Sequence, residues 1–543
     1  MRCHPRLHAV LLLVVVAVAA AMRLPDLGRR PMHGDEAVQA FKLKELWEEG
    51  KLPYDPRQYH GPTLSYLTLA GIRLTGVADF AEIDSAHLRL VPVLFSLGTL
   101  LLLLLLFDGL GRGAALCAAL LAALSPAMTF YSRYFIHESL LVFLTLAAIA
   151  AGWRFSQSGR LGWALLAGAA LGLMHATKET CVIAFGCMAA ALMIARVWGS
   201  RGDGATTPAT RSREATLTRS HGDRTQSRAR LPHIGAALLA AACVSALLYS
   251  GFFSNPSGPL DSLRAYASYL DRAGGGDLHR HPWHYYLDIL LFRGSGPGPA
   301  WSEGLIVALA VVGAAATVAR WGIEWAQLHF LRFLLPYALL MTAAYAVIPY
   351  KTPWCLLQFL TPLILLAGTG AVALLRWPPG AGLRLAAGAA LLVAASHLGW
   401  QAERASHRFA ADARNPYAYA QPHGDVARLG AWIDRLSAAH PDGRRMPVKV
   451  IAEDPWPLPW YLRRLEAVGY WEEPPEDPSA PVVIFDVRLG STIEEWLPGG
   501  SVAASYGLRP GALLQVHVEA SLLEAFTRTE EKPPSPGPAE DRR

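Results

Sequence analysis

Charged residues are scarce in this sequence. Asp, Glu, Lys and Arg together make up 17% of its 543 residues, whereas soluble globular proteins contain about 25%. Apolar and aromatic residues make up 52%. This composition excludes an intrinsically disordered protein and argues against an ordinary soluble enzyme. The net charge is +6, and where these charges lie along the chain matters more than their sum. No nucleic-acid partner is expected.

Cysteine is also scarce, and two common types of motif are missing. The six cysteines include no C-x-x-C pair, and none follows Cys355, which argues against a disulfide framework and a zinc–cysteine site. The glycine-rich loops GxGxxG and GxxxxGK[ST] are absent as well, so no phosphate-binding loop of those types is expected. We interpret the cysteines as small buried apolar residues.

Long apolar segments dominate the first 400 residues. A helix needs about 20 apolar residues to cross the hydrocarbon core of a bilayer. Eleven segments approach or reach that length, and they predict a polytopic α-helical membrane domain over residues 1–400. The predicted spans are 8–22, 88–107, 113–131, 137–153, 161–177, 180–198, 233–253, 302–320, 331–348, 354–375 and 385–400.

The arginines predict which loops lie in the cytoplasm, because positive residues are retained on that side. Placing the N-terminus inside leaves the arginine-rich connections inside and, after an odd number of spans, sends residues 401–543 outside. Arg23, Arg29 and Arg30 are exceptions that fall outside. The inside connections include residues 199–232, which are rich in Arg, Ser and Thr and are expected to form a disordered cytoplasmic loop.

The C-terminal part of the chain has the pattern of a small soluble domain. Apolar residues recur with helical periodicity over 425–439, and residues 447–452 and 481–485 resemble short buried strands. These patterns predict a small extracytoplasmic α/β domain over residues 401–530. The end of the chain, 531–543, is rich in Pro and Glu and is expected to be disordered.

Most of the unusual polar motifs fall in loops on the predicted outer side, including the large first loop 23–87. Ionisable groups at a membrane boundary are costly unless they are paired or hydrated, so clusters of them indicate a functional site. Interfacial anchoring by Trp, Tyr, Lys and Arg is the alternative for any one cluster, but it does not explain six on the same side. The clusters are His33–Glu36, Tyr59–Pro62, Arg133–Glu138, Lys178–Glu179, His281–Tyr286 and Tyr350–Trp354.

Asp35 and Glu36 are the candidate catalytic residues. A carboxylate at the membrane surface can accept a proton from an acceptor hydroxyl or amide, and it can also hold a divalent cation. The alternative is structural, since acidic residues at the start of a helix over 36–49 would favour its dipole. One histidine beside one carboxylate can ligate a metal. No metal-ligand spacing occurs, so we expect no required cofactor and retain a divalent metal as an option.

Arg133, Lys178 and Lys351 are the candidates for binding a donor phosphate. Each lies at the outer end of an apolar span. Together they could neutralise the phosphate or diphosphate of a lipid carrier, which lies at this depth. The alternatives are snorkelling toward lipid headgroups and pairing with the nearby Glu138 and Glu179.

The remaining candidates would bind substrate. Aromatic residues can present flat faces to sugar rings or isoprenoid chains, although interfacial anchoring explains them equally well. In the C-terminal domain, the aromatic loop 454–461 is expected to face the membrane domain and to shape the acceptor entrance. The substrate-binding candidates are His33, His60, His137, Glu138, Glu179, His281, Trp283, His284, Tyr350 and Trp354.

The ordered set of motifs resembles the membrane glycosyltransferases of the GT-C class. It is similar to the protein O-mannosyltransferases and aminoarabinose lipid A transferases of glycosyltransferase family 39 and relatives. The motifs look most like a bacterial and archaeal subfamily labelled as flippase-activity-associated, over about residues 8–500. They are His33-Gly34-Asp35-Glu36, Tyr59-His60-Gly61-Pro62, Ser132-Arg133-Tyr134-Phe135, Lys178-Glu179-Thr180, Tyr350-Lys351-Thr352-Pro353-Trp354 and Asn415-Pro416-Tyr417.

This resemblance implies an inverting glycosyltransferase. It would take a sugar from a polyprenyl-phosphate donor on the outer face of the plasma membrane, with Asp35 as the general base. The acceptor would be a protein or an envelope glycan or lipid. Two departures leave the donor sugar and the acceptor open: Glu138 follows His137 where mannosyltransferases tend to have an aspartate after a hydrophobic pair, and the C-terminal domain is not a β-trefoil.

A non-catalytic lipid-carrier transporter or flippase accessory protein is the alternative function. A transporter of this kind usually has internal repeats and charges near the middle of the membrane. The sequence has no convincing repeat, and its charges concentrate at the outer edge. This distribution favours the transferase.

Overall fold

The computed structural model describes residues 5–52, 54–57, 60–204, 213–274, 279–294, 298–497 and 500–530. The chain divides into two units. The first, called here the membrane unit, comprises Met1–Leu27, Lys42–Gly76 and Asp84–Tyr419. The second, called the C-terminal unit, comprises Gly28–Phe41, Val77–Ile83 and Ala420–Arg543. Two parts of the large first loop therefore belong to the C-terminal unit.

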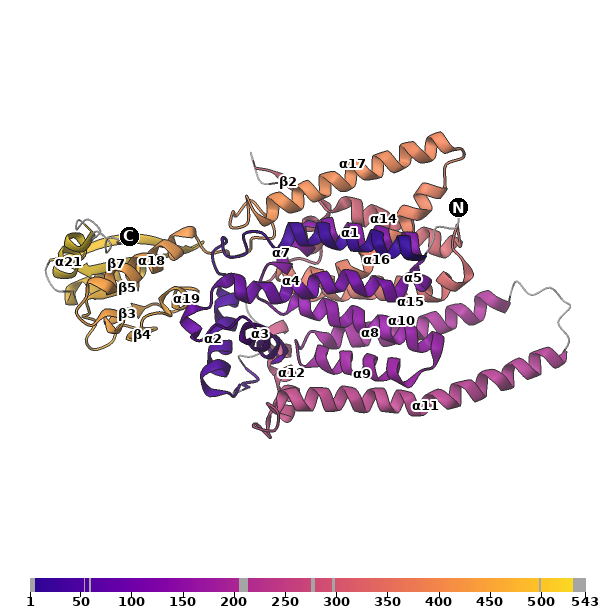
Figure 1. Ribbon diagram of the computed structural model, residues 1–543, viewed down its shortest axis with the longest axis horizontal. Coiled ribbons are helices and arrows are strands. Elements are labelled where there is room, and N and C mark those ends of the chain that lie inside the picture. Colours follow the sequence, from indigo (N-terminus) through magenta and orange to yellow (C-terminus); the bar gives the residue numbers. More distant parts are fainter. Residues whose placement is uncertain are drawn as a thin grey trace, which may run out of the picture. The chain divides into compact units, whose positions relative to one another are not determined.

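Eight helices of the membrane unit are long and apolar enough to cross a membrane, among the residues that the structure describes. Most of them run side by side in Figure 1. α4 continues through the 3-10 turn η2 (Leu103–Leu106) and α5 (Phe107–Leu110), and α16 follows η3 (Pro353–Leu356). The eight are α1 (Pro5–Arg23), α4 (Ser85–Leu102), α8 (Glu138–Ser158), α10 (Cys181–Gly204), α11 (Arg213–Tyr249), α15 (Trp325–Val347), α16 (Leu357–Arg376) and α17 (Ala381–Ser406).

A further span is broken into α6 (Arg112–Leu124) and α7 (Pro126–Ser132), which meet at 61°. The break falls at Ser125, whose hydroxyl accepts a hydrogen bond from the Met128 amide, just before a proline that has no N–H to donate. The end of α6 exposes carbonyl groups that no helical N–H can reach. The guanidinium of Arg23 donates to two of these oxygens at 3.0 Å each. This buried contact explains why Arg23 is an exception to the distribution of arginines along the chain.

Two other apolar helices are shorter, α9 (Leu161–His175) and α14 (Gly304–Ala319). At 1.5 Å per residue they are about 23–24 Å long, whereas the hydrocarbon core is about 30 Å thick. Each of the eleven predicted spans contains a helix. By length and composition, however, the described chain has eight spans, or nine with the bent pair. The prediction of eleven was higher because a hydropathy window also counts apolar residues in the turns beyond a helix.

α16 packs closely against its neighbours through small residues. A side-chain carbon at Gly370 would lie 1.9 Å from the backbone oxygen of Leu309 in α14, and one at Gly368 would lie 2.2 Å from that of Ala114 in α6. Such an approach is open only to glycine and is typical of helices in membranes. α16, which follows Lys351 and the η3 turn, is therefore held on two sides.

The connections between the spans contain more helix than expected. The range 199–232, predicted to be disordered, is helical where the structure describes it, because α10 reaches Gly204 and α11 begins at Arg213. Residues 205–212 lie outside the described residues. No proline interrupts 213–231, and its Ala, Arg and Gln residues favour helix. The other elements are α2 (Gly34–Glu49), α3 (Thr63–Arg73), η1 (Phe80–Glu82), α12 (Gly258–Gly274), α13 (Tyr285–Leu291) and the antiparallel strands β1 (Arg293–Gly294) and β2 (Ala300–Trp301).

A five-stranded sheet forms the centre of the C-terminal unit, in the order β4-β3-β5-β7-β6. β3 is parallel to β4 and β5, and β7 is antiparallel to β5 and β6. The sequence predicted β3 and β5 but not β4 or the β6–β7 hairpin, in which many residues are exposed or half-buried. The strands are β3 (Val448–Ile451), β4 (Val468–Trp471), β5 (Val482–Asp486), β6 (Ser501–Arg509) and β7 (Ala512–Glu519).

One face of this sheet carries the main core of the unit. Apolar residues of α18, which the sequence predicted, pack there against β3, β5 and β7, together with residues of α19 and α21. Figure 1 shows α18 and α21 beside the strands. The elements are α18 (Gly424–Ala439), η4 (Gly443–Arg445), α19 (Leu458–Leu462), η5 (Val487–Leu489), α20 (Gly490–Ile493), η6 (Glu494–Trp496) and α21 (Ala520–Glu530).

The C-terminal unit begins later than the sequence predicted. α17 continues to Ser406, and the membrane unit extends to Tyr419, so residues 401–419 are not part of the α/β domain. Hydropathy drops near residue 400, but the helix does not end there. The predicted disordered end 531–543 and the motif residue Tyr59 lie outside the described residues.

The cysteines in the described part of the chain are all free thiols. They are Cys117, Cys181, Cys187, Cys243 and Cys355.

Candidate active site

Asp35 and Glu36 lie in the first turn of α2. His33 precedes the helix, and its carbonyl oxygen accepts a hydrogen bond from the Ala37 amide at 3.0 Å. The Nδ1 atom of His33 accepts a hydrogen bond from the Asp35 amide at 3.1 Å, and the His33 amide donates to Glu36 Oε2 at 2.9 Å. This reciprocal pair has the pattern of a capping box with histidine as the cap. It fixes the backbone that carries Asp35.

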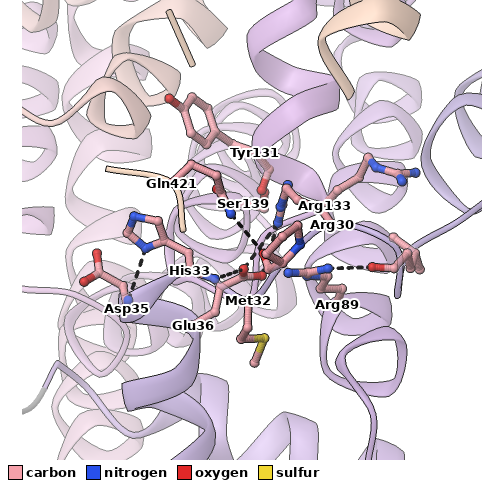
Figure 2. A network of polar contacts seen from close by, with 12 residues as sticks. Arg30, Met32, His33, Asp35, Glu36, Arg89, Tyr131, Arg133, Ser139 and Gln421 are labelled. Carbon is pink, nitrogen blue, oxygen red and sulfur yellow. Dashed lines mark hydrogen bonds and ion pairs between the residues drawn. The ribbon is translucent and has the colours of Figure 1, made fainter. Parts of the chain in front are cut away.

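The two carboxylates have different surroundings. Glu36 is fully buried and forms an ion pair with Arg30 at 3.3 Å. Asp35 is exposed, and within the described residues no hydrogen bond or ion pair engages its carboxylate. Figure 2 shows the Asp35 carboxylate turned away from the Arg30–Glu36 pair. Glu36 therefore holds the loop to the helix, while Asp35 is available for proton transfer.

A second group of predicted site residues lies in the membrane unit, where α3 and α8 begin and where α9 connects to α10. Nδ1 of His60 lies 2.8 Å from Glu179 Oε2, and the ammonium group of Lys178 forms an ion pair with Glu138. The ring of His137 meets that of His60 edge-on, with the ring centroids 5.1 Å apart. These five residues are called here the ionisable cluster.

The loop before α3 is held directly against the end of α9. The hydroxyl and the amide of Thr63 donate to the carbonyl oxygen of Ala176 at 2.6 and 3.1 Å. A side-chain carbon at Gly61 would lie 2.0 Å from that same oxygen, so the approach requires glycine. The His60-Gly61 motif therefore positions the His60 ring against Glu179.

Burial and neighbouring charges set the protonation of the ionisable cluster. Burial, together with the nearby His60 and Lys178, holds the pKa of His137 well below its ordinary value of 6.5, so this imidazole is neutral at pH 7. Burial alone would raise the pKa of Glu179, but the His60 ring lowers it. Burial likewise opposes the charge of Lys178, whereas the Glu138 carboxylate raises its pKa. The acidic and basic members are thus paired, and one neutral imidazole lies beside them.

The sequence contains no candidate ligands at a spacing that is characteristic of a metal site. The described residues contain no group of three His, Cys, Asp or Glu side chains that is suited to a metal ion. The expectation that no metal is required stays a prediction.

Lys351 is a buried cation without an acidic partner. It is 1% exposed, and its ammonium group donates to the carbonyl oxygens of Ile348 and His281, the latter at 3.3 Å. No carboxylate in the described part of the chain forms an ion pair with it. Burial lowers its pKa. A buried charge without a counter-charge is unfavourable, and an anionic ligand would offset this cost.

Aromatic rings surround the segment that carries Lys351. The rings of His281 and Tyr285 stack with centroids 4.0 Å apart, and Nδ1 of His279 lies 2.6 Å from the hydroxyl of Tyr419. Flat apolar faces therefore lie beside a cation, an arrangement suited to a sugar or an isoprenoid next to a phosphate. This aromatic cluster comprises His279, His281, Tyr285, Tyr350, Trp354 and Tyr419.

Three other predicted site residues have contacts outside these groups. Arg133 donates to carbonyl oxygens at and after the end of α1, two of them at 2.7 Å. Trp283 is 66% exposed, and His284 pairs with Asp288 at 2.8 Å on the surface. The three predicted phosphate-binding cations thus have separate sets of protein contacts, and their joint binding of one phosphate stays a prediction.

The sequence interpretation missed a buried carboxylate, that of Glu303. This fully buried residue accepts hydrogen bonds from the Ser125 hydroxyl at 2.6 Å, the Ala127 amide at 2.8 Å and the Tyr417 hydroxyl at 3.0 Å. It joins the bend of the broken span to the Asn-Pro-Tyr motif. The signal available in the sequence is a lone acidic residue directly before the apolar segment 304–319.

Part of the chain is similar to a known protein family. The model of the family described as "Dolichyl-phosphate-mannose-protein mannosyltransferase" matches residues 74–254, about a third of the chain. That range includes four residues of the ionisable cluster but neither Asp35 nor Lys351. No curated protein matches the sequence.

Solved structures of two membrane proteins align over nearly the whole chain. ArnT from Cupriavidus metallidurans bound to undecaprenyl phosphate aligns with a TM-score of 0.61 and 16% identity, covering 94% of this chain and 98% of that one. The archaeal oligosaccharyltransferase AglB from Archaeoglobus fulgidus, in complex with an inhibitory peptide and a dolichol-phosphate, aligns with a TM-score of 0.53 and 13% identity, covering 90% and 71%. The chain therefore is a polytopic helical membrane protein with a GT-C-like fold. The finer subfamily stays a prediction.

Proposed function

We propose that this multi-pass membrane protein is an inverting glycosyltransferase that moves a sugar from a polyprenyl-phosphate donor to an acceptor on the outer face of the plasma membrane. The observation that carries the proposal is Lys351, a buried ammonium group whose hydrogen bonds go to backbone carbonyl oxygens. A lipid phosphate would supply the missing negative charge. ArnT and AglB, which share the fold, have structures with undecaprenyl phosphate and a dolichol-phosphate.

Inversion needs a base that takes the acceptor proton during attack. Asp35 suits this role, because its carboxylate is exposed and its backbone is fixed by the His33 cap. The acceptor oxygen or nitrogen bonds to the anomeric carbon while the bond from that carbon to the phosphate oxygen breaks. The proton passes to Asp35, and the departing polyprenyl phosphate keeps the bonding electrons and leaves as an anion.

The ionisable cluster is proposed to bind hydroxyl groups of the sugar or of the acceptor. Tyr54 packs with Ala176, just before Lys178 and Glu179 in the chain. Oε1 of Glu179 and the hydroxyl of Tyr54 are buried atoms without a hydrogen-bond partner among the described residues. Buried polar groups of this kind are normally satisfied by a partner or a ligand. A carboxylate oxygen that accepts and a phenol that can donate or accept would pair with hydroxyls of a sugar.

The outer face is proposed from the order of the apolar helices. Successive spans alternate in direction. If the bent pair and the shorter helices α9 and α14 cross together with the eight long helices, the eleven crossings put the connections that hold Lys178 and Lys351 on the same side as the end of the last span. The arginine distribution assigns that side to the outside. An acceptor there would be a protein or an envelope glycan or lipid.

The proposal is tested by label transfer with the full chain in lipid nanodiscs. A panel of radiolabelled polyprenyl-phosphate hexoses is incubated with the protein and a cell-envelope extract. We expect transfer by the wild type and by the control Glu49→Gln, which alters an exposed carboxylate on the same helix, and loss of transfer in Asp35→Asn. Movement of the labelled carrier between leaflets without transfer to any acceptor would support the transporter alternative and contradict the proposal.

A further inference from the structure

We infer that Tyr461 and Gln421 are positioning residues that set the direction of Asp35. This inference rests on the proposed function, in which Asp35 is the base. The hydroxyl oxygen of Tyr461 accepts a hydrogen bond from the Met32 amide at 2.8 Å, and the side-chain amide of Gln421 donates to the carbonyl oxygen of Pro31 at 3.0 Å. The side chains of two residues late in the sequence thus hold Pro31 and Met32, which directly precede the His33 cap of α2.

The segment held in this way leads directly to the reacting group. Every residue from Arg30 to His33 makes a polar contact that fixes it within the C-terminal unit. The carboxylate of Asp35 takes part in no such contact with a described residue, so its direction follows from the backbone that carries it. Figure 2 shows Gln421, Met32, His33 and Glu36 around this short stretch of backbone.

Tyr461 is itself supported by the core of the C-terminal unit. It lies on α19, and a side-chain carbon at Gly430 of α18 would lie 2.5 Å from its Cβ, so the glycine lets α19 approach α18 closely. On the same aromatic segment, the ring of Trp456 packs edge-on against Phe41 of α2, with centroids 5.2 Å apart. The segment predicted to shape the acceptor entrance therefore connects the domain core to the helix that carries Asp35.

Positioning and structural support predict different effects. Removing the Tyr461 hydroxyl leaves the buried Met32 amide without its acceptor, so the variant should lose some stability but still fold. Catalysis is far more sensitive, because displacing a reacting group by about 1 Å can lower the rate about 10²-fold. The large effect is therefore expected in kcat, with donor binding unchanged and only a moderate decrease in thermal stability.

The first experiment measures sugar transfer by full-length Tyr461→Phe and Gln421→Leu in nanodiscs. We expect kcat to fall about 10- to 100-fold in Tyr461→Phe, with unchanged affinity for undecaprenyl phosphate and an unchanged apparent KM for the donor. Tyr506→Phe is the matched control, because the Tyr506 ring stacks on Trp432 in the same unit. It should behave like the wild type.

A double variant separates positioning from general damage. In an Asp35→Asn background, Tyr461→Phe should have no further effect on kcat, because a base that is missing cannot be misplaced. Additive losses would show that Tyr461 acts independently of Asp35 and would overturn the inference. Hydrogen exchange supplies a readout without activity: the Met32 amide should exchange faster in Tyr461→Phe than in the wild type.

The outcomes distinguish this inference from the proposed function. Full turnover by Asp35→Asn would overturn the proposed function and, with it, the role of Tyr461. An inactive Asp35→Asn together with a fully active Tyr461→Phe would overturn the inference alone. Slow turnover of Tyr461→Phe with unchanged exchange at Met32 would also overturn it, since the segment would then not have moved.

Discussion

Nδ1 of His60 lies 2.8 Å from Oε2 of Glu179, although 119 residues separate them in the sequence. The contact joins the loop before α3 to the connection between α9 and α10. Beside it, Lys178 pairs with Glu138 at the start of α8. Several helices of the membrane unit thus end in one shared polar layer, and charges that would be costly to bury separately are paired within it.

His137 should make the free energy of unfolding depend on pH. Its pKa is held well below 6.5 in the folded chain by burial and nearby cations, so the unfolded chain binds a proton first as the pH falls. Stability should therefore decrease below about pH 6.5, and His137→Gln should lose less stability than the wild type over the same range. Thermal unfolding in detergent between about pH 7 and 5 measures this. The control His284→Gln should follow the wild type, and equal slopes for both variants would contradict the prediction.

Lys351→Met should separate ligand binding from stability. The variant removes a buried charge that has no acidic partner among the described residues, so the unliganded protein should be at least as stable as the wild type. Affinity for undecaprenyl phosphate should fall at least about tenfold, since a charge-assisted hydrogen bond is lost. Lys51→Met, at an exposed lysine, is the control. Undiminished binding by Lys351→Met would refute its role.

Through Lys351, a rise in pH should change lipid-phosphate binding and protein stability in opposite directions. Its pKa is lowered by burial from 10.5, so the folded chain loses this proton at a lower pH than the unfolded chain does. As the pH rises toward 10.5, the unliganded wild type should gain stability from this group while its affinity for the lipid phosphate falls. Lys351→Met should show neither change. Parallel titrations of unfolding temperature and lipid binding test both signs.

Asp35→Asn and Glu36→Gln should give opposite profiles. Loss of a general base should lower turnover about 10²–10⁴-fold with little change in stability, because Asp35 is exposed. Glu36 is buried and paired with Arg30, so Glu36→Gln should destabilise the protein by about 3–5 kcal/mol. Turnover and thermal unfolding are measured on both variants. A stable, inactive Glu36→Gln beside an active Asp35→Asn would mean that Glu36 is the base.

Glu303→Ala should destabilise the membrane unit more than Tyr417→Phe does. The alanine leaves three buried donors without their acceptor, and each unsatisfied group costs about 1–3 kcal/mol. Tyr417→Phe removes one hydrogen bond and leaves the carboxylate with its other two donors. Unfolding in detergent compares the two variants. Equal effects would show that the Ser125 and Ala127 bonds contribute nothing.

Much of the membrane fold could be predicted from local composition. Each of the eleven apolar segments contains a helix, because only a helix satisfies its own backbone groups in hydrocarbon. The helix over 425–439 and the strands near 447–452 and 481–485 were also predicted correctly. The helix has apolar residues at helical spacing, and the strands are short apolar runs that are buried almost throughout. The β6–β7 hairpin could not be predicted in this way, because its burial is irregular.

Only the tertiary structure decided which polar residues meet. Asp35 and Glu36 are adjacent and chemically alike, yet one is exposed and the other is buried against Arg30. Lys178 and Lys351 both end apolar segments, but only Lys178 has a carboxylate partner in the described chain. A local sequence pattern indicates how much of a segment is buried. Which side chain meets another from more than a hundred residues away depends instead on how the helices and loops pack. The sequence therefore determined the spans and the candidate residues, and packing determined their charge states and their roles.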